Sequence, residues 1–224
     1  MQKKLFLLIL VLRLTNVYGQ VPVHEEPRHH LVFQNKDIRI LNVLLPPGDT
    51  SLYHIHNTLS LFIRLSDTKT GSQNKGRQAS GGSSTSGTVL FENLSPPNTR
   101  THRVWNADID TFHVMDVELL YKDSGFIHKP LTLPDLTIEI DTPWIRAYRI
   151  QLPKGKDFKL IDNKQSFVLV SLHASFVSAK VDGKENDKKL SPGSFFVIEG
   201  RQNFSIINNS DESAAFILLE LPLH

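Results

Sequence analysis

The 224-residue sequence contains no cysteine. This absence excludes a disulfide scaffold, cysteine-based zinc sites, iron–sulfur clusters and thiol catalysis. A metal ion would therefore have to be held by histidine, aspartate, glutamate or other oxygen ligands. The chain also lacks an excess of either charge, because 25 lysines and arginines stand against 23 aspartates and glutamates. A general nucleic-acid-binding protein carries a clear basic excess, so we expect no nucleic-acid partner.

The sequence has little in the way of long hydrophobic runs. Residues 5–14 form an apolar run, interrupted only by Arg13, that is too short to span a bilayer. Lys3 and Lys4 precede it and Val17–Gly19 follow it, which is typical of a cleavable secretory signal. We interpret residues 1–19 as a signal peptide and expect a periplasmic or secreted protein without stable membrane insertion. An uncleaved amphipathic anchor is the alternative.

The remaining chain contains no stretch that sustains a helical period for three turns. It consists of short runs rich in valine, isoleucine, leucine and phenylalanine, separated by proline, glycine and asparagine. Many short strands between turns indicate a sandwich or barrel, and the sequence predicts an all-β fold. The predicted strands include residues 37–45, 59–65, 102–106, 112–120, 144–152, 166–177, 195–199 and 214–221.

One segment, residues 71–88, has almost no apolar content because it is composed mainly of glycine and serine. Such a composition buries too little surface to offset the entropy of ordering it. We predict a flexible loop here and favour a solvated insertion over a gating lid.

An internal repeat divides the chain after the signal. Residues 38–49 (IRILNVLLPPGD) recur as residues 145–156 (IRAYRIQLPKGK), and residues 102–106 match residues 204–208. The repeat predicts two related β domains in tandem. Their expected bounds are residues 20–125 and residues 126–224.

Three histidines of the first copy form a candidate metal site. His54 and His56 are two residues apart on a predicted strand, so both imidazoles project from one face. His102, on another predicted strand, could bring a third imidazole to the same point. Three histidines suit one divalent ion of iron, manganese, zinc, copper or nickel.

These residues also carry a resemblance to the cupin superfamily. Gly48, His54 and His56 have the spacing that opens the first cupin motif, and His102 and Asn106 match the end of the second. The resemblance implies a jelly-roll barrel with a metal site at the three histidines. It covers nearly all of the chain after the signal.

Two departures from the cupin pattern narrow that implication. Pro97 stands where the second motif has proline, but Thr99 replaces its glycine. The glutamate of the first motif would fall at Ser60 or Leu61, which cannot supply a carboxylate ligand. The resemblance therefore implies a site of three histidines without the usual glutamate, as in some cupin dioxygenases.

The second copy keeps the frame and loses the histidines. Their positions are taken by Ile161, Asn163 and Phe204, whereas Asn208 keeps the asparagine. The two halves together resemble a bicupin with a metal site in the N-terminal domain and a degenerate C-terminal domain.

Three further side chains close to the motifs are candidates for catalysis: His113, Arg64 and Tyr53. His113 shares its strand face with the apolar alternate residues of the range 113–119, so we expect it to point inward. It is a candidate fourth ligand, acid–base group or core histidine. Alternation places Tyr53 on the outer face, which counts against it.

Other polar residues favour structural roles. Arg39 recurs as Arg146 and Asn106 recurs as Asn208, although the second copy lacks the histidines. We expect the asparagines to cap turns. The charged segment His24–His30 is interpreted as an exposed N-terminal stretch.

The sequence thus favours an exported mononuclear metalloenzyme of dioxygenase type that acts on a small chelating organic substrate. A metal-dependent isomerase or lyase is the next alternative among enzymes. A non-catalytic cupin that binds a small molecule or metal is the alternative from another class, and an envelope interaction protein is a third. The resemblance also implies a possible homodimer.

Overall fold

The computed structural model describes residues 20–121, 125–133 and 135–222, and the proposed signal peptide lies outside them. The described chain is all-β apart from one turn of 3-10 helix, η1 (Val23–Glu25). Within it, no helix has the length and apolar character required to cross a membrane.

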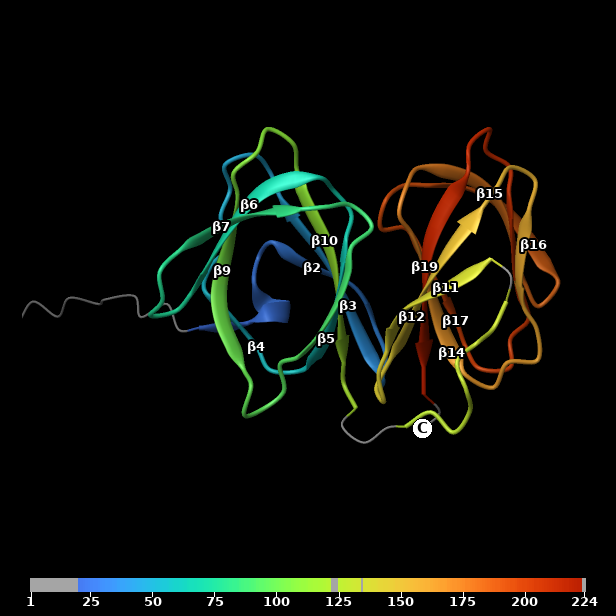
Figure 1. Cartoon of the computed structure of the whole chain (residues 1–224), viewed down its shortest axis with the longest axis horizontal. Coiled ribbons are helices and arrows are strands. Elements are labelled where there is room, and N and C mark those ends of the chain that lie inside the picture. Colours follow the sequence, from blue (N-terminus) through green and yellow to red (C-terminus); the bar gives the residue numbers. More distant parts are fainter. Residues whose placement is uncertain (1–19, 122–124, 134, 223–224) are drawn as a thin grey trace, which may run out of the picture.

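The first half of the chain folds into two five-stranded sheets (Figure 1). One sheet has the order β2 (His29–Gln34), β3 (Ile38–Leu45), β10 (Phe112–Leu119), β5 (Leu59–Arg64), β8 (Val89–Asn93). The other has the order β1 (Val21–Pro22), β4 (His54–His56), β9 (Arg100–Asn106), β6 (Thr68–Asn74), β7 (Ser80–Ser84). Together these sheets form the first barrel.

The second half repeats this arrangement. Its five-stranded sheet has the order β11 (Leu136–Asp141), β12 (Arg146–Leu152), β19 (Ala214–Leu221), β14 (Ser166–Ser171), β17 (Phe195–Ile198). Its four-stranded sheet has the order β13 (Asp157–Leu160), β18 (Phe204–Asn208), β15 (Ser175–Val181), β16 (Lys184–Leu190). The strand orders correspond one to one, apart from the added β1. The predicted all-β class with two tandem jelly-roll barrels is confirmed.

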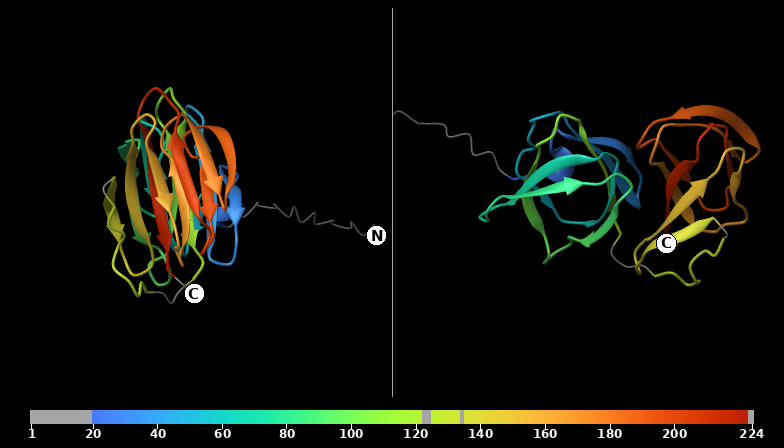
Figure 2. Two further views of the ribbon diagram at one scale, coloured as in Figure 1. Left: turned by 90° about the vertical axis from the view of Figure 1, so that its right-hand side faces the viewer. Right: turned by 45° about the horizontal axis from the view of Figure 1, so that its top comes forward.

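The two barrels pack against each other through an apolar core. Residues of β5 and β10, such as Leu61 and Val117, share one buried cluster with residues of β14 and β19, such as Val168 and Leu219. At its edge, Phe91 stacks on Trp144 with ring centroids 5.9 Å apart. Figure 2 shows the two barrels side by side, with these sheets facing each other. One face of each of these sheets therefore belongs to the junction and the other to a barrel interior.

The prediction of a flexible loop over residues 71–88 is wrong. Residues 68–74 and 80–84 pair as the antiparallel hairpin of β6 and β7, and β6 also pairs with β9. Composition was a poor guide to this segment because the hydrogen bonds between strands involve only backbone N–H and C=O groups. Glycine and serine have these groups like any other residue except proline. Gly71 is also needed locally, because a Cβ atom there would overlap the indole of Trp105 on β9.

The two repeated asparagines cap turns, as expected. Asn106 donates its side-chain amide to the carbonyl of Leu45 at 2.9 Å, and Asn208 donates to the carbonyl of Leu152 at 2.8 Å. Both are buried, so these bonds satisfy the last carbonyl of β3 and of β12.

Candidate metal centre

The three sequence-predicted histidines meet inside the first barrel. His54 and His56 are buried on one face of β4, and His102 on the neighbouring strand β9 pairs directly with His54. The rings of His54 and His102 are 4.7 Å apart between centroids, and those of His56 and His102 are 5.0 Å apart. The Nε2 atoms of His56 and His102 are 3.1 Å apart, a spacing that two ligands of one ion would have.

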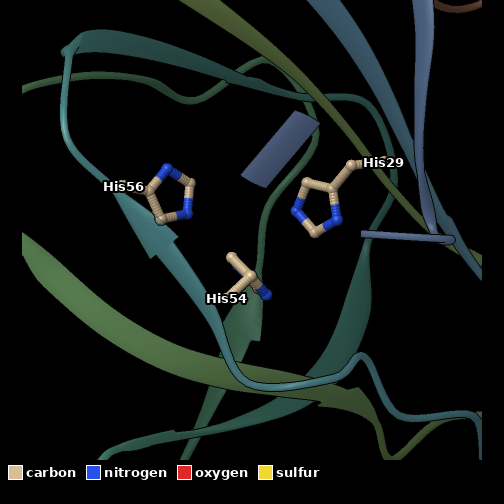
Figure 3. Close-up of side chains that lie close together, drawn as sticks. All are labelled: His29, His54 and His56. Atoms are coloured by element: carbon tan, nitrogen blue, oxygen red, sulfur yellow. The ribbon is translucent and has the colours of Figure 1, made fainter. Parts of the chain in front are cut away.

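A fourth histidine joins them that the sequence did not predict. His29 begins β2, and its ring centroid lies 4.5 Å from that of His54. One nitrogen from each of His29, His54 and His56 lies within 4.8 Å of the others. Figure 3 shows these three rings facing one another, His29 from the side opposite β4.

The interpretation of residues 24–30 as exposed is therefore wrong in part. Glu26 and His29 are buried, because the chain passes through η1 into the ring of strands before β2 begins (Figure 1). The pairing of His29 with Val43 aims it at the interior, since Val43 belongs to the interior apolar cluster. The sequence signal for this burial was the presence of Glu26 three residues before His29. The two side chains can be buried only if they pair with each other, because a buried charge needs a partner.

Neighbouring groups orient two of the imidazoles. The Nδ1 atom of His29 lies 2.6 Å from Oε2 of Glu26, and that of His54 lies 2.9 Å from the carbonyl oxygen of Leu52. Because both partners are acceptors, each imidazole donates through Nδ1 and keeps its lone pair on Nε2. Nε2 of His54 is buried without a hydrogen-bond partner in the described chain.

Burial keeps three of the imidazoles uncharged. It lowers the pKa of His54 to about 4, with the charge of His29 adding to the effect. Burial and then the charge of His54 lower the pKa of His102 to about 2, and burial and then His102 lower that of His56 well below its usual value. Neutral imidazoles with free lone pairs are the form that binds metal ions.

Two buried carboxyl groups lie behind the histidines. Burial acts to raise the pKa of Glu26, but hydrogen bonds from His29 and the amide of Leu52 outweigh it, and the net shift is downward. Asp116 on β10 is fully buried, with Oδ2 3.6 Å from Nδ1 of His56. Burial and then the charge of Glu118 raise the pKa of Asp116 well above its usual value, although other nearby groups act to lower it.

The histidines open onto a cavity of about 270 Å³. Arg64 and Arg100 line it together with Glu92, which forms an ion pair with Arg100. Phe62 supplies an apolar wall, with its ring 5.7 Å from that of His56. The lining thus combines two arginines, one glutamate, two phenylalanine rings and four imidazoles.

Of the three catalytic candidates, Arg64 lines the cavity and the other two do not. His113 is half-buried, and burial lowers its pKa, but it faces the junction of the barrels, where Nε2 lies 2.6 Å from Oδ1 of Asn42 and beside Gly193. The expectation that His113 points inward mistook the junction for the barrel interior, because both are apolar. Tyr53 faces outward, donating to Gln73 at 2.8 Å with Arg103 over its ring.

The strand register also corrects the assignment of the second copy. Phe204, the counterpart of His102, pairs with Leu160 rather than Ile161, so Leu160 stands where His54 stands in the first barrel. Ile161 is exposed and lies beyond β13. The repeat aligned from the sequence is therefore out of register by one residue at this strand.

The arrangement fits a metal ion. His29, His54 and His56 bring one nitrogen each within 4.8 Å of one another, and His102 lies beside the last two. One of these nitrogens, Nε2 of His54, is buried without a partner in the described chain, and cysteine is absent, so the donor set is one that iron, copper, nickel, zinc and manganese accept.

No family model matches the sequence. No curated protein matches it either. Solved structures do match. AerE from Microcystis aeruginosa has a TM-score of 0.60 at 13% identity, over 90% of this chain and 96% of that one. YhaK from Escherichia coli has a TM-score of 0.56 at 16% identity, over 87% and 91%.

A third match is a point mutant of salicylate 1,2-dioxygenase from Pseudoaminobacter salicylatoxidans, solved in complex with gentisate. Its TM-score is 0.61 at 11% identity, over 91% of this chain and 76% of that one. Identities this low show likeness of fold alone, and the matches support a cupin-like fold over most of the chain.

Proposed function

We propose that this chain is an exported cupin metalloprotein whose first barrel holds one divalent metal ion through His54, His56 and His102, with His29 as a fourth ligand. The second barrel is its metal-free partner, as in a bicupin. The observation that carries the proposal is the meeting of four imidazoles from β2, β4 and β9 at one cavity.

The reaction we propose is of dioxygenase type, on a small chelating organic substrate. His54, His56 and His102, with His29, would hold the ion, which would supply binding and activation of substrate and dioxygen. Salicylate 1,2-dioxygenase, of similar fold, has been solved with gentisate, which supports a small organic substrate.

The chain's own residues bind and orient that substrate. Neutral histidines leave the charge of a divalent ion uncompensated by its protein ligands. Arg64 adds positive charge to the cavity, whereas Glu92 offsets the charge of Arg100. Glu92 holds Arg100 in place through its ion pair. An enolate or a catecholate would therefore bind with its oxygens toward the histidines, while Phe62 keeps water from that side.

A non-catalytic metal-binding cupin is the second candidate, and His29 favours it. A fourth protein ligand occupies a position that substrate or dioxygen would otherwise use. The two candidates differ in whether the metal keeps exchangeable positions.

Elemental analysis of the natively purified protein tests the metal site, and oxygen uptake with diketones, catechols and gentisate tests the reaction. We expect about one divalent ion per chain, and its loss in the double variant His54→Ala/His56→Ala. The matched control is His30→Ala/His173→Ala, because both of its histidines are exposed.

Retention of the metal by the His54→Ala/His56→Ala variant would show that the site is elsewhere. A full complement of metal without oxygen uptake on any of these substrates would favour the binding protein over the enzyme.

A further inference from the structure

Asp116 is a buried group that a structural role does not explain. Neither of its oxygens has a hydrogen-bond partner of ordinary distance and angle in the described chain, although the nearby hydroxyl of Ser60 acts to lower its pKa. Nδ1 of His56, which lies 3.6 Å away, has no such partner either. Buried polar groups without partners are rare because they lose their hydration without replacement. An apolar residue of similar volume would remove this penalty.

The second barrel shows that the fold does not need a carboxyl group here. Asp116 pairs with Leu41 on β3, and the corresponding pair of the second barrel is Leu218 with Tyr148. Leu218 is fully buried. The carboxyl group is therefore specific to the barrel that carries the histidines.

The imidazole protons indicate what the carboxyl group does. With Nε2 of His56 and Nε2 of His102 only 3.1 Å apart, one of the two carries the proton that the other accepts. A metal ion that binds both atoms needs both lone pairs, so the proton of His56 must then lie on Nδ1. Oδ2 of Asp116 is the acceptor that faces this atom.

We propose that Asp116 is a positioning residue of the metal centre: it accepts a hydrogen bond from Nδ1 of His56, which keeps the proton on Nδ1, and so directs the lone pair of Nε2 to the ion. Glu26 already holds His29 in this way, at 2.6 Å. Carboxylates that fix ligating histidines through their second nitrogen orient the ring and raise its basicity. This role rests on the proposed metal site and adds a second carboxyl group to it.

Zinc binding by the full-length protein tests the proposal, measured by competition with a chromophoric chelator. We expect Asp116→Leu to weaken zinc binding about 10- to 100-fold. Asp116→Asn should weaken it less, because the amide oxygen can still accept a hydrogen bond from Nδ1 of His56. The matched control is Glu220→Gln, because Glu220 is equally buried but lies in the second barrel, where it accepts a hydrogen bond from Tyr148 at 2.6 Å. Its zinc affinity should stay within about threefold of the wild type.

A second measurement separates positioning from a loss of structure. Histidine-selective ¹⁵N NMR of the zinc-loaded protein should show His56 protonated on Nδ1 in the wild type and in Asp116→Asn, with that proton exchanging faster in Asp116→Leu. The metal-free Asp116→Leu protein should unfold at a higher temperature than the wild type, because it no longer buries an unpartnered carboxyl group.

The outcomes distinguish the two proposals. Equal zinc affinity and equal Nδ1–H exchange in wild type and Asp116→Leu would overturn the role of Asp116 and leave the metal site standing. A wild type that binds no zinc or other divalent ion would overturn the proposed function and this role with it.

Discussion

The two barrels share one strand order but differ in what fills them. The second barrel encloses an apolar core that includes Leu160 and Phe204. At the same two facing positions the first barrel has His54 and His102, next to a cavity. The comparison shows that this jelly roll forms with apolar side chains at these positions. The histidines of the first barrel are therefore not needed for the fold.

What both barrels keep is the frame. Arg39 lies 2.7 Å from the buried Glu118, and the corresponding Arg146 lies 3.6 Å from the buried Glu220. In the second barrel, Tyr148 also donates to Glu220 at 2.6 Å. Because the pair recurs in the barrel that lacks counterparts of His54 and His102, it belongs to the fold rather than to the site.

The largest expected effect comes from making the first barrel resemble the second. His54→Leu/His102→Phe installs the facing pair of the second barrel. We expect it to lower the affinity for divalent metal more than about 100-fold, because each substitution removes a ligand. The metal-free variant should stay folded, as judged by its far-ultraviolet circular dichroism and thermal unfolding. Metal content by elemental analysis is the deciding measurement, and a variant that keeps its metal would contradict the site.

A smaller effect concerns the pH dependence of the metal-free protein. His54 takes up a proton at its ordinary pKa of 6.5 when unfolded but only near a pKa of about 4 when folded. The unfolded state therefore binds more protons between these values, and the free energy of unfolding falls as the pH drops through this window, by about 3 kcal/mol for this histidine.

Urea unfolding at about pH 7 and about pH 5 measures about 2 kcal/mol of this fall, because the rest lies below pH 5. The variant His54→Leu should lose less stability between the two pH values than the wild type, since leucine does not titrate. His173→Ala, which changes an exposed histidine of the second barrel, is the control. Identical pH profiles for wild type and His54→Leu would mean that His54 is not held neutral by burial.

Much of the fold could be predicted because it follows from short-range patterns. Alternation and turn residues identified the strands, and the repeat of Ile38–Asp49 identified two copies. Of the site, His54 and His56 could be predicted from their spacing, and His102 from its place in the second cupin-like motif. His29 could not, because its place depends on pairing with Val43, which the sequence does not state. His113 was misjudged because alternation gives a face but not which of two apolar environments that face meets.

The smallest expected effect concerns the β6–β7 hairpin, which the sequence predicted as a flexible loop because of its glycine and serine content. Gly71 on β6 packs under Trp105, and the corresponding pair in the second barrel is Ser178 with Ile207. Gly71→Ser alone should destabilise the protein by about 1–3 kcal/mol, because its Cβ overlaps the indole. Adding Trp105→Ile should recover part of this loss, since the pair then matches the second barrel. A double-mutant cycle from urea unfolding gives the coupling energy. A coupling energy near zero would mean that the cost of Gly71→Ser does not depend on Trp105. The two hairpins would then differ at this position for another reason.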